Sequence, residues 1–314
     1  IILAGDPNSI NSEIIYKSWK KLNNSIKKRI YIISNYSLLQ SQFKKLNYRI
    51  KLEKVRKFNE DNNNNKLKIL DINLNYKDPF NIERKKASKF ILKCLDLAHN
   101  LALKSETAGL VNCAISKNLL NKQKIGVTEY PASKSSLKND SEVMLIMNNK
   151  LSVSPITTHI NIKDISKKLK KELIINKVKT IEFWYQKKFK KKAKIAILGL
   201  NPHNAELRET SEERKIIIPA INKLKKLGIN INGPLVSDTI FINDYKKFDV
   251  IVGMFHDQVL APFKALFKFN AINITLGLPF VRISPDHGPN ESMLGKNLSN
   301  PLSLIRAIEF LDKN

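Results

Sequence analysis

Long apolar runs and a disulfide framework are both missing from this sequence. No apolar stretch has the roughly 20 residues that a membrane-spanning helix needs, so we expect no membrane segment. The only two cysteines, Cys94 and Cys113, lie in apolar patterns. We interpret them as core residues of a protein from the reducing cytoplasm. The opening IILAGDP lacks a basic segment and predicts a core strand rather than a signal peptide.

Two common phosphate-binding motifs are also absent. The sequence contains neither GxGxxG nor GxxxxGK[ST]. If a nucleotide binds, the protein holds it without a Rossmann fingerprint or a P-loop. Glycine and proline are scarce altogether, with 10 and 12 copies among 314 residues.

Acidic residues are few beside the basic ones. Lys and Arg number 55 against 28 Asp and Glu, which gives a formal net charge of +27. Such a charge is typical of nucleic-acid-binding proteins. Here the lysines are scattered, lack interleaved aromatic residues and accompany abundant Asn and Ile, so biased codon usage explains them better. We expect no nucleic-acid partner, although a positive field would attract an anionic substrate.

What the sequence does contain is an alternation of strand-like and helical segments. Strand-like runs occur at residues 1–5, 29–34, 67–74, 108–115, 142–149, 151–160, 193–200, 249–255 and 271–277. Residues 79–105 and 211–228 have apolar residues at helical spacing, and Gly228 fits a helix end. This alternation predicts an α/β protein with a mainly parallel sheet covered by helices.

Three of the five histidines follow strand-like runs. His159, His203 and His256 each lie at or just beyond the carboxyl end of such a run. In a parallel sheet these ends share one edge, which is where ligands bind. Three imidazoles there suit a divalent transition metal, although any one of them alone is more often a satisfied polar residue. His99 lies within a helical pattern, and we expect it to be ordinary.

Further polar candidates accompany these histidines. Asp257 and Asp238 can accept the second imidazole proton or orient a substrate. Lys264, Asn273 and Arg282 follow His256 along the chain. Lys and Arg supply charge for a phosphate group, and Asn supplies a neutral donor and acceptor. A lone Lys in so basic a chain is usually only solvated, so Arg282, which lies between apolar residues, is the more telling of the two.

Seven segments follow one another in a characteristic order. They are AGDP with Glu13, GVTEYPA at 126–132, ITTHI, ILGLNPH, GPLVSDTIF, FHDQVLAPFK and NITLGLPFVRISPDHG. In this order they resemble the 4-hydroxythreonine-4-phosphate dehydrogenase family. The resemblance implies an α/β fold like isocitrate and isopropylmalate dehydrogenases, with two α/β/α domains and the active site in the cleft between them. Residues 1–125 with 275–314 would form the cofactor-side domain. Residues 126–274 would form the domain with the metal ligands and the dimer interface.

The resemblance also implies an activity. It is the NAD-dependent oxidation of 4-phosphooxy-L-threonine, a phosphorylated hydroxy amino acid, with decarboxylation to 3-amino-2-oxopropyl phosphate in pyridoxal phosphate biosynthesis. His159, His203 and His256 match metal ligands that a homodimer shares between its subunits, so a lone subunit should lack a complete site. Zinc, cobalt and magnesium remain alternatives for the metal, as does NADP for NAD.

Other positions match the family by the same resemblance. Thr128, Lys264, Asn273 and Arg282 match substrate-binding positions. Asp257, Asp238 and Lys264 are the candidate catalytic residues, and Asp286, His287 and Gly288 are the candidate cofactor-binding residues.

The sequence departs from the family pattern at several places. Val127 replaces the His of a GHTEY segment, and Ser9 and Asn11 replace glycines near the amino terminus. The segments NAELRETSEER after His203 and HGPNESMLGK at 287–296 also differ from the family. These departures leave open a dehydrogenase for 4-phospho-D-threonate or 4-phospho-D-erythronate, or a catalytically weakened homologue. Together with the net charge of +27, they also leave open a binding protein without turnover, including a basic nucleic-acid binder.

Overall fold

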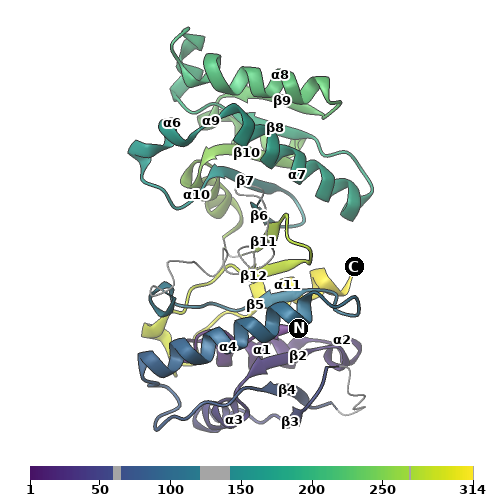
Figure 1. Ribbon diagram of the computed structural model, residues 1–314, viewed down its shortest axis with the longest axis vertical. Coiled ribbons are helices and arrows are strands. Elements are labelled where there is room, and N and C mark those ends of the chain that lie inside the picture. Colours follow the sequence, from purple (N-terminus) through teal and green to yellow (C-terminus); the bar gives the residue numbers. More distant parts are fainter. Residues whose placement is uncertain (59–64, 121–141, 269, 314) are drawn as a thin grey trace. The chain divides into compact units, whose positions relative to one another are not determined.

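The computed structural model describes residues 1–58, 65–120, 142–268 and 270–313 (Figure 1). The chain divides into two compact units, which are residues 1–135 with 278–314, and residues 136–277. The sequence placed one boundary at 274/275, but residues 275 and 276 continue strand β11, which pairs with β6 inside the second unit. The other expected boundary, at 125/126, lies outside the described residues.

The described strands of the first unit are all parallel to their neighbours. They are β1 (Ile2–Leu3), β2 (Tyr31–Ser34), β3 (Leu52–Val55), β4 (Leu67–Asp71), β5 (Leu110–Asn112) and β12 (Arg282–Pro285). Their order is β3-β4-β2-β1-β5-β12. The central strands are buried and rich in Ile, Leu and Val, as is usual for a parallel sheet with both faces covered.

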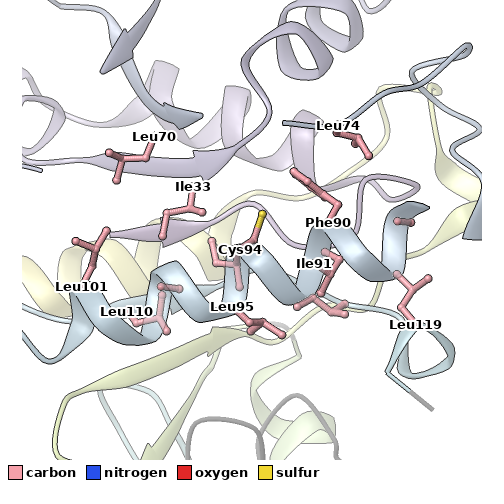
Figure 2. Packing of buried hydrophobic residues seen from close by; sticks show 14 of the residues in the cluster. Ile33, Leu70, Leu74, Phe90, Ile91, Cys94, Leu95, Leu101, Leu110 and Leu119 are labelled. Atoms are coloured by element: carbon pink, nitrogen blue, oxygen red, sulfur yellow. The ribbon is translucent and has the colours of Figure 1, made fainter. Parts of the chain in front are cut away.

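Helix α4 supplies much of the core of the first unit. The helices of this unit are α1 (Asn11–Lys21), α2 (Asn24–Lys28), α3 (Tyr36–Lys45), α4 (Arg84–Ala102) and α11 (Leu302–Asp312), with 3-10 turns at Lys117–Leu119 and Glu291–Met293. The buried residues of α4 recur at helical spacing. Figure 2 shows Phe90 and Cys94 on the side of α4 that faces Ile33 of β2. The predicted helix within residues 79–105 is therefore confirmed, and Cys94 is a core residue.

The second unit has a mixed sheet. Its strands are β6 (Val143–Met147), β7 (Ser152–Thr157), β8 (Ile195–Leu198), β9 (Ile231–Leu235), β10 (Val250–Phe255) and β11 (Ile272–Leu276), in the order β11-β6-β7-β10-β8-β9. Strand β6 is antiparallel to both β11 and β7, whereas β7, β10, β8 and β9 are mutually parallel.

A tight turn explains the antiparallel pair. The Asn148 backbone N–H donates to the Leu151 carbonyl at 3.1 Å. Asn148 Oδ1 accepts the backbone N–H groups of Lys150 and Leu151 at 2.8 and 3.0 Å. A turn this short can join only antiparallel strands. The predicted α/β class is therefore confirmed, but the sheet of the second unit is mixed rather than mainly parallel.

Helices α6 (Ile165–Lys168), α7 (Lys171–Phe189), α8 (Ile218–Lys226), α9 (Ser237–Ile240) and α10 (His256–Phe267) complete the second unit, with 3-10 turns at Ile162–Asp164, Pro202–Leu207 and Asp244–Lys247 and a π-helical turn at Glu213–Ile217. Gly228 has φ +76° and follows Leu227, the residue that caps the carboxyl end of α8. Glycine adopts this left-handed conformation without strain, so the predicted helix end is confirmed. Among the described residues, no helix is long and apolar enough to cross a membrane.

Candidate active site

The three strand-end histidines lie at one edge of the sheet in the second unit. Strands β7, β10 and β8 are adjacent and parallel, so their carboxyl ends point the same way. His159 lies two residues beyond β7, and His256 opens α10 directly after β10. His203 lies in the 3-10 turn that follows β8, which we call η4 (Pro202–Leu207).

Two of these imidazoles form a pair. The ring centroids of His159 and His256 are 5.8 Å apart, and their planes are inclined by 38°. His256 Nδ1 lies 2.7 Å from Asp257 Oδ1. Because a carboxylate only accepts hydrogen bonds, Nδ1 carries a proton, and in the neutral imidazole Nε2 then keeps its lone pair. This contact is the one that the sequence suggested for Asp257, and it prepares Nε2 as a ligand.

His203 lies in an unusual stretch of backbone. Residues 203–207 have φ angles between 47° and 56°, in the left-handed region, although none of them is glycine. Such residues each cost about 1 kcal/mol. The imidazole of His203 is exposed, and the described part of the chain contains no group of three His, Cys, Asp or Glu side chains that could hold a metal. One copy of the chain therefore pairs two candidate ligands and presents the third separately.

A buried acid anchors the segment just before His203. Glu213 is 0% exposed, and its Oε1 accepts the backbone N–H groups of Leu200 and Asn201, both at 2.8 Å. Its Oε2 accepts Asn201 Nδ2 at 3.0 Å. Sequence reasoning missed Glu213. Its only signal was an acidic residue that follows the histidine by ten positions, at the start of a helical pattern.

The remaining candidates of the second unit differ in their surroundings. Asp238 is exposed in the first turn of α9, and within the described ranges no hydrogen bond joins it to an imidazole. Only Asp257 therefore has the predicted acceptor geometry. Lys264 is exposed in the last turn of α10, eight residues after His256. Asn273 lies in β11, and its buried Oδ1 has no hydrogen-bond partner among the described residues.

Arg282 is held in place in the first unit. It opens β12, is 2% exposed, and donates from Nη2 to Asn112 Oδ1 at 3.3 Å. Asn112 is fixed in turn, because its Nδ2 donates to the Cys113 carbonyl at 2.7 Å. The charge and the fork geometry of a guanidinium suit an anion such as a phosphate group.

The candidate cofactor residues follow β12. His287 Nδ1 lies 3.1 Å from the Gly288 carbonyl, which can only accept, so Nδ1 donates and Nε2 is an acceptor. Nε2 is buried and has no partner within the described ranges. Burial lowers the pKa of His287 despite the opposing effects of Gly288 and Asp286. The Asp286 backbone N–H donates to Ser303 Oγ at 2.7 Å, which ties this segment to α11.

The altered glycine positions near the amino terminus are not strained. Gly5 has φ +77°, but neither Ser9 nor Asn11 has a positive φ. Ser9 Oγ donates to the Asp6 carbonyl at 2.6 Å, and Asn11 Nδ2 donates to the Ala114 carbonyl at 2.7 Å. These two replacements therefore add hydrogen bonds without forcing the backbone. Thr128 and Val127, with the rest of segment 126–132, lie outside the described residues.

Comparison with known proteins decides the family. The model of the pyridoxal phosphate biosynthetic protein PdxA matches residues 25–311. The chain belongs to the PdxA family. A protein of a Sulfurihydrogenibium species named 4-hydroxythreonine-4-phosphate dehydrogenase is 40% identical over 98% of this chain and 95% of its own length.

Two further PdxA relatives bear on structure and substrate. The crystal structure of a 4-hydroxythreonine-4-phosphate dehydrogenase from Klebsiella pneumoniae matches with a TM-score of 0.86 at 26% identity, over 99% of this chain and 96% of that chain. An Oceanobacillus iheyensis protein with a different name, putative D-threonate 4-phosphate dehydrogenase, is 30% identical over 98% of this chain and 95% of its own length. The names of these relatives support an oxidoreductase.

The side chains of this PdxA-family chain offer two imidazoles to a metal and one buried acceptor to a cofactor. Ring nitrogens lie about 2 Å from a bound zinc, so imidazoles whose centroids are 5.8 Å apart are within reach of one ion. On the cofactor side, His287 Nε2 is a buried acceptor without a described partner. A Cβ at Gly288 would meet only Asn290 Oδ1 at 3.5 Å, an ordinary contact. The packing of the chain therefore does not require glycine at position 288. Because Gly288 has no side chain, a ligand could approach its backbone closely.

Proposed function

We propose that this chain oxidises 4-phosphooxy-L-threonine with NAD and a divalent metal, and that decarboxylation then gives 3-amino-2-oxopropyl phosphate for pyridoxal phosphate biosynthesis. The observation that carries the proposal is the His159–His256 pair with Asp257 on Nδ1 of His256, in a chain of the PdxA family. The proposal includes the isocitrate dehydrogenase-like architecture that the resemblance implies.

The histidine pair has the features of a metal-holding element. Asp257 keeps the proton of His256 on Nδ1, so Nε2 is free to donate its lone pair. Imidazole nitrogens suit zinc and cobalt best. When bound, the metal supplies Lewis-acid stabilisation of negative charge at the substrate hydroxyl, and NAD accepts the hydride.

Other residues of the chain would bind and orient the substrate and cofactor. Arg282, supported by Asn112, supplies a fixed positive charge for the phosphate group. Lys264 supplies a second charge, and the buried Oδ1 of Asn273 is an acceptor for a substrate donor. Binding energy from the phosphate, which does not react, would hold the reacting carbon in place. His287 would accept a hydrogen bond from the cofactor through Nε2.

The third imidazole of the site would come from a second copy of the chain. His203 is exposed and does not join the His159–His256 pair within a described metal-binding group. Two large apolar side chains near the same edge are also exposed. Ile162 follows His159 by three residues and is 81% exposed, and Ile242 follows α9 and is 67% exposed. Exposed apolar residues beside an incomplete site favour a homodimer that shares its metal.

Formation of NADH tests the proposal directly. Purified protein should reduce NAD with 4-phosphooxy-L-threonine, EDTA should abolish the reaction, and zinc, cobalt or magnesium should restore it. His256→Gln should weaken zinc binding by more than about a hundredfold, since it removes a ligand. His99→Gln is the matched control, because His99 lies in α4 with its ring edge-on to Phe280. Activity that survives complete metal removal would contradict the metal role.

A second substrate is the main competing function. The Oceanobacillus relative is named for D-threonate 4-phosphate, which carries a hydroxyl where the first substrate has an amino group. Comparison of kcat/KM for the two compounds decides between them. A ratio of more than about tenfold in favour of 4-phospho-D-threonate would replace the proposed substrate and leave the reaction class unchanged.

A further inference from the structure

Gln258 is the third polar residue in the segment His256-Asp257-Gln258, and the proposed chemistry does not use it. Its side chain makes two short hydrogen bonds. Nε2 donates to the Gly199 carbonyl at 2.6 Å, and Oε1 accepts the Met254 backbone N–H at 2.6 Å. One amide thus joins the carboxyl end of β8 to that of β10.

This bridge begins where the backbone ladder ends. Strands β8 and β10 pair from Ile195 and Val250 to Ile197 and Val252. Beyond that point β10 continues beside β7, with Gly253 opposite Pro155 and Phe255 opposite Thr157. Strand β8 instead pairs Leu198 with Leu235 of β9. The Gln258 amide therefore connects β8 to β10 by hydrogen bonds beyond the point where the backbone pairing of these strands ends.

The bridge reaches the segments that carry two candidate metal ligands. Gly199 lies four residues before His203, and Met254 lies two residues before His256. Glu213 holds the next two backbone N–H groups after Gly199. The two side chains together fix the start of the left-handed turn in which His203 lies.

The backbone leaves room for this amide. A Cβ at Gly253 would lie 2.9 Å from Gln258 Oε1 and 2.6 Å from Val259 Cγ1, so a side chain there would displace the Gln258 amide. A Cβ at Gly199 would lie 2.1 Å from Asn204 Oδ1 and would displace that amide in the same way. Asn204 Nδ2 donates to the Pro234 carbonyl at 3.0 Å. Both glycines thus admit amides that brace the strand ends.

We propose that Gln258 is a positioning residue that fixes the separation of the strand ends bearing His203 and His256, and that tight metal binding depends on this separation. The inference rests on the proposed metal site. In a two-fold dimer that shares its ligands, a shift of β8 against β10 in each copy would move one imidazole of each site relative to the other ligands. The geometry of both sites would then change together.

Metal binding, measured apart from catalysis, tests the role. Gln258→Met keeps the length of the side chain and removes both hydrogen bonds. We expect zinc to bind about tenfold more weakly, as for other groups that orient ligands without touching the metal. The visible absorption of the cobalt-loaded protein, which reports ligand geometry, should change as well. A chromophoric chelator gives the zinc affinity by competition.

A matched control separates positioning from general stability. Gln42 also bridges two backbone segments, because its Nε2 donates to the carbonyls of Pro7 and Pro79 at 2.9 and 2.7 Å in the first unit. Gln42→Met should lower thermal stability, while zinc affinity and the cobalt spectrum stay those of the wild type. Gln258→Glu is a second variant of equal size. It keeps the acceptor for the Met254 backbone N–H and loses the donor to the Gly199 carbonyl. Its added negative charge attracts cations, so the charge by itself cannot lower the affinity for zinc.

The outcomes are distinct. Weaker zinc binding and an altered cobalt spectrum in both Gln258 variants, but not in Gln42→Met, would support the positioning role. Folded Gln258 variants that match the wild type in both measurements would overturn it and leave the proposed function intact. Gln258 variants that unfold while Gln42→Met stays folded would show a structural role instead. A wild-type chain that binds neither zinc nor cobalt would overturn the metal site and this inference together.

Discussion

At the residue scale, Glu13 joins two segments that are far apart in the sequence. It is 1% exposed and accepts hydrogen bonds from Lys17 Nζ at 2.8 Å and from the backbone N–H and hydroxyl of Ser299, both at 2.6 Å. Burial by itself raises the pKa of the Glu13 carboxyl, but these donors outweigh burial and hold the pKa below its usual value. Helix α1 is thereby tied to the segment that precedes α11.

Replacement of Glu13 by Gln should lower the free energy of unfolding by about 2 kcal/mol at neutral pH, because hydrogen bonds to a charged group are lost. The depressed pKa of the folded state means that this stabilisation is complete above the unfolded value of 4.5. It disappears as the pH falls through the folded value. Thermal unfolding at a series of pH values should show a Tm difference between wild type and Glu13→Gln that shrinks below pH 4.5. A difference that does not vary with pH would contradict the ionised carboxylate as the cause.

The same scale shows which site residues a sequence can reveal. The position of a polar residue after a strand-like run was enough to predict the shared edge of His159, His203 and His256, since parallel strands end on one side. The contact of Asp257 could be predicted because Asp257 is next to His256 in the sequence. The role of Glu213 could not be predicted, because Glu213 binds backbone N–H groups whose positions depend on the folded turn. The roles of the candidate substrate and cofactor residues stay predictions.

At the element scale, the turn η4 stores conformational strain in an exposed segment. Residues 203–207 are all left-handed, a conformation that glycine adopts freely and other residues adopt at a cost. The family resemblance associates this segment with glycine, whereas this chain has NAEL after His203. Asn204 tolerates the conformation better than most residues, and its amide binds the Pro234 carbonyl. The other residues of the turn have no such advantage.

Glu206→Gly should therefore stabilise the protein. Glu206 is exposed with φ +50°, so the change relieves strain of about 1–2 kcal/mol without opening a cavity. This gain exceeds the cost of up to about 1 kcal/mol that glycine adds through the freedom of the unfolded chain. Glu209→Gly is the control, because Glu209 is equally exposed and does not have a positive φ. It should leave stability unchanged or lower it by up to about 1 kcal/mol, since glycine adds freedom to the unfolded chain. Denaturant unfolding of both variants measures the difference, and equal effects would argue against strain in the turn.

Three strands were missed by sequence analysis, for physical reasons that differ. Strands β3 and β9 stand at the ends of the strand order in their units, so one side of each lacks a neighbouring strand within the described part of the chain. Their sequences, LEKV and INGPL, are too polar or too interrupted by Gly and Pro to show a strand pattern. Strand β12 contains a buried Arg282 and only four residues. The strands that were predicted are apolar along most of their length, which is why pattern sufficed for them.

At the scale of the whole molecule, the candidate metal site of one chain is incomplete within the described residues. Helix α9 packs against η4, which carries His203, and Ile242 lies just beyond α9 with 67% of its surface exposed. Ile162, 81% exposed, lies in the segment that follows His159. A second copy that supplies the third imidazole would also cover these two residues.

If the proposed dimer shares its metal, charged substitutions at this edge should dissociate it and weaken metal binding together. Ile162→Asp and Ile242→Asp place unpaired charges where apolar contact is expected, so self-association should weaken by more than about tenfold. Zinc affinity should fall with it, because each monomer then retains only the His159–His256 pair. Phe183→Asp is the control, since Phe183 is 68% exposed on α7, which packs against the sheet and α8 rather than at the histidine edge. Sedimentation and zinc competition on the same samples measure both quantities. A variant that becomes monomeric yet binds zinc like the wild type would show that one chain completes the site alone, and His203 would then have to move toward the pair on binding.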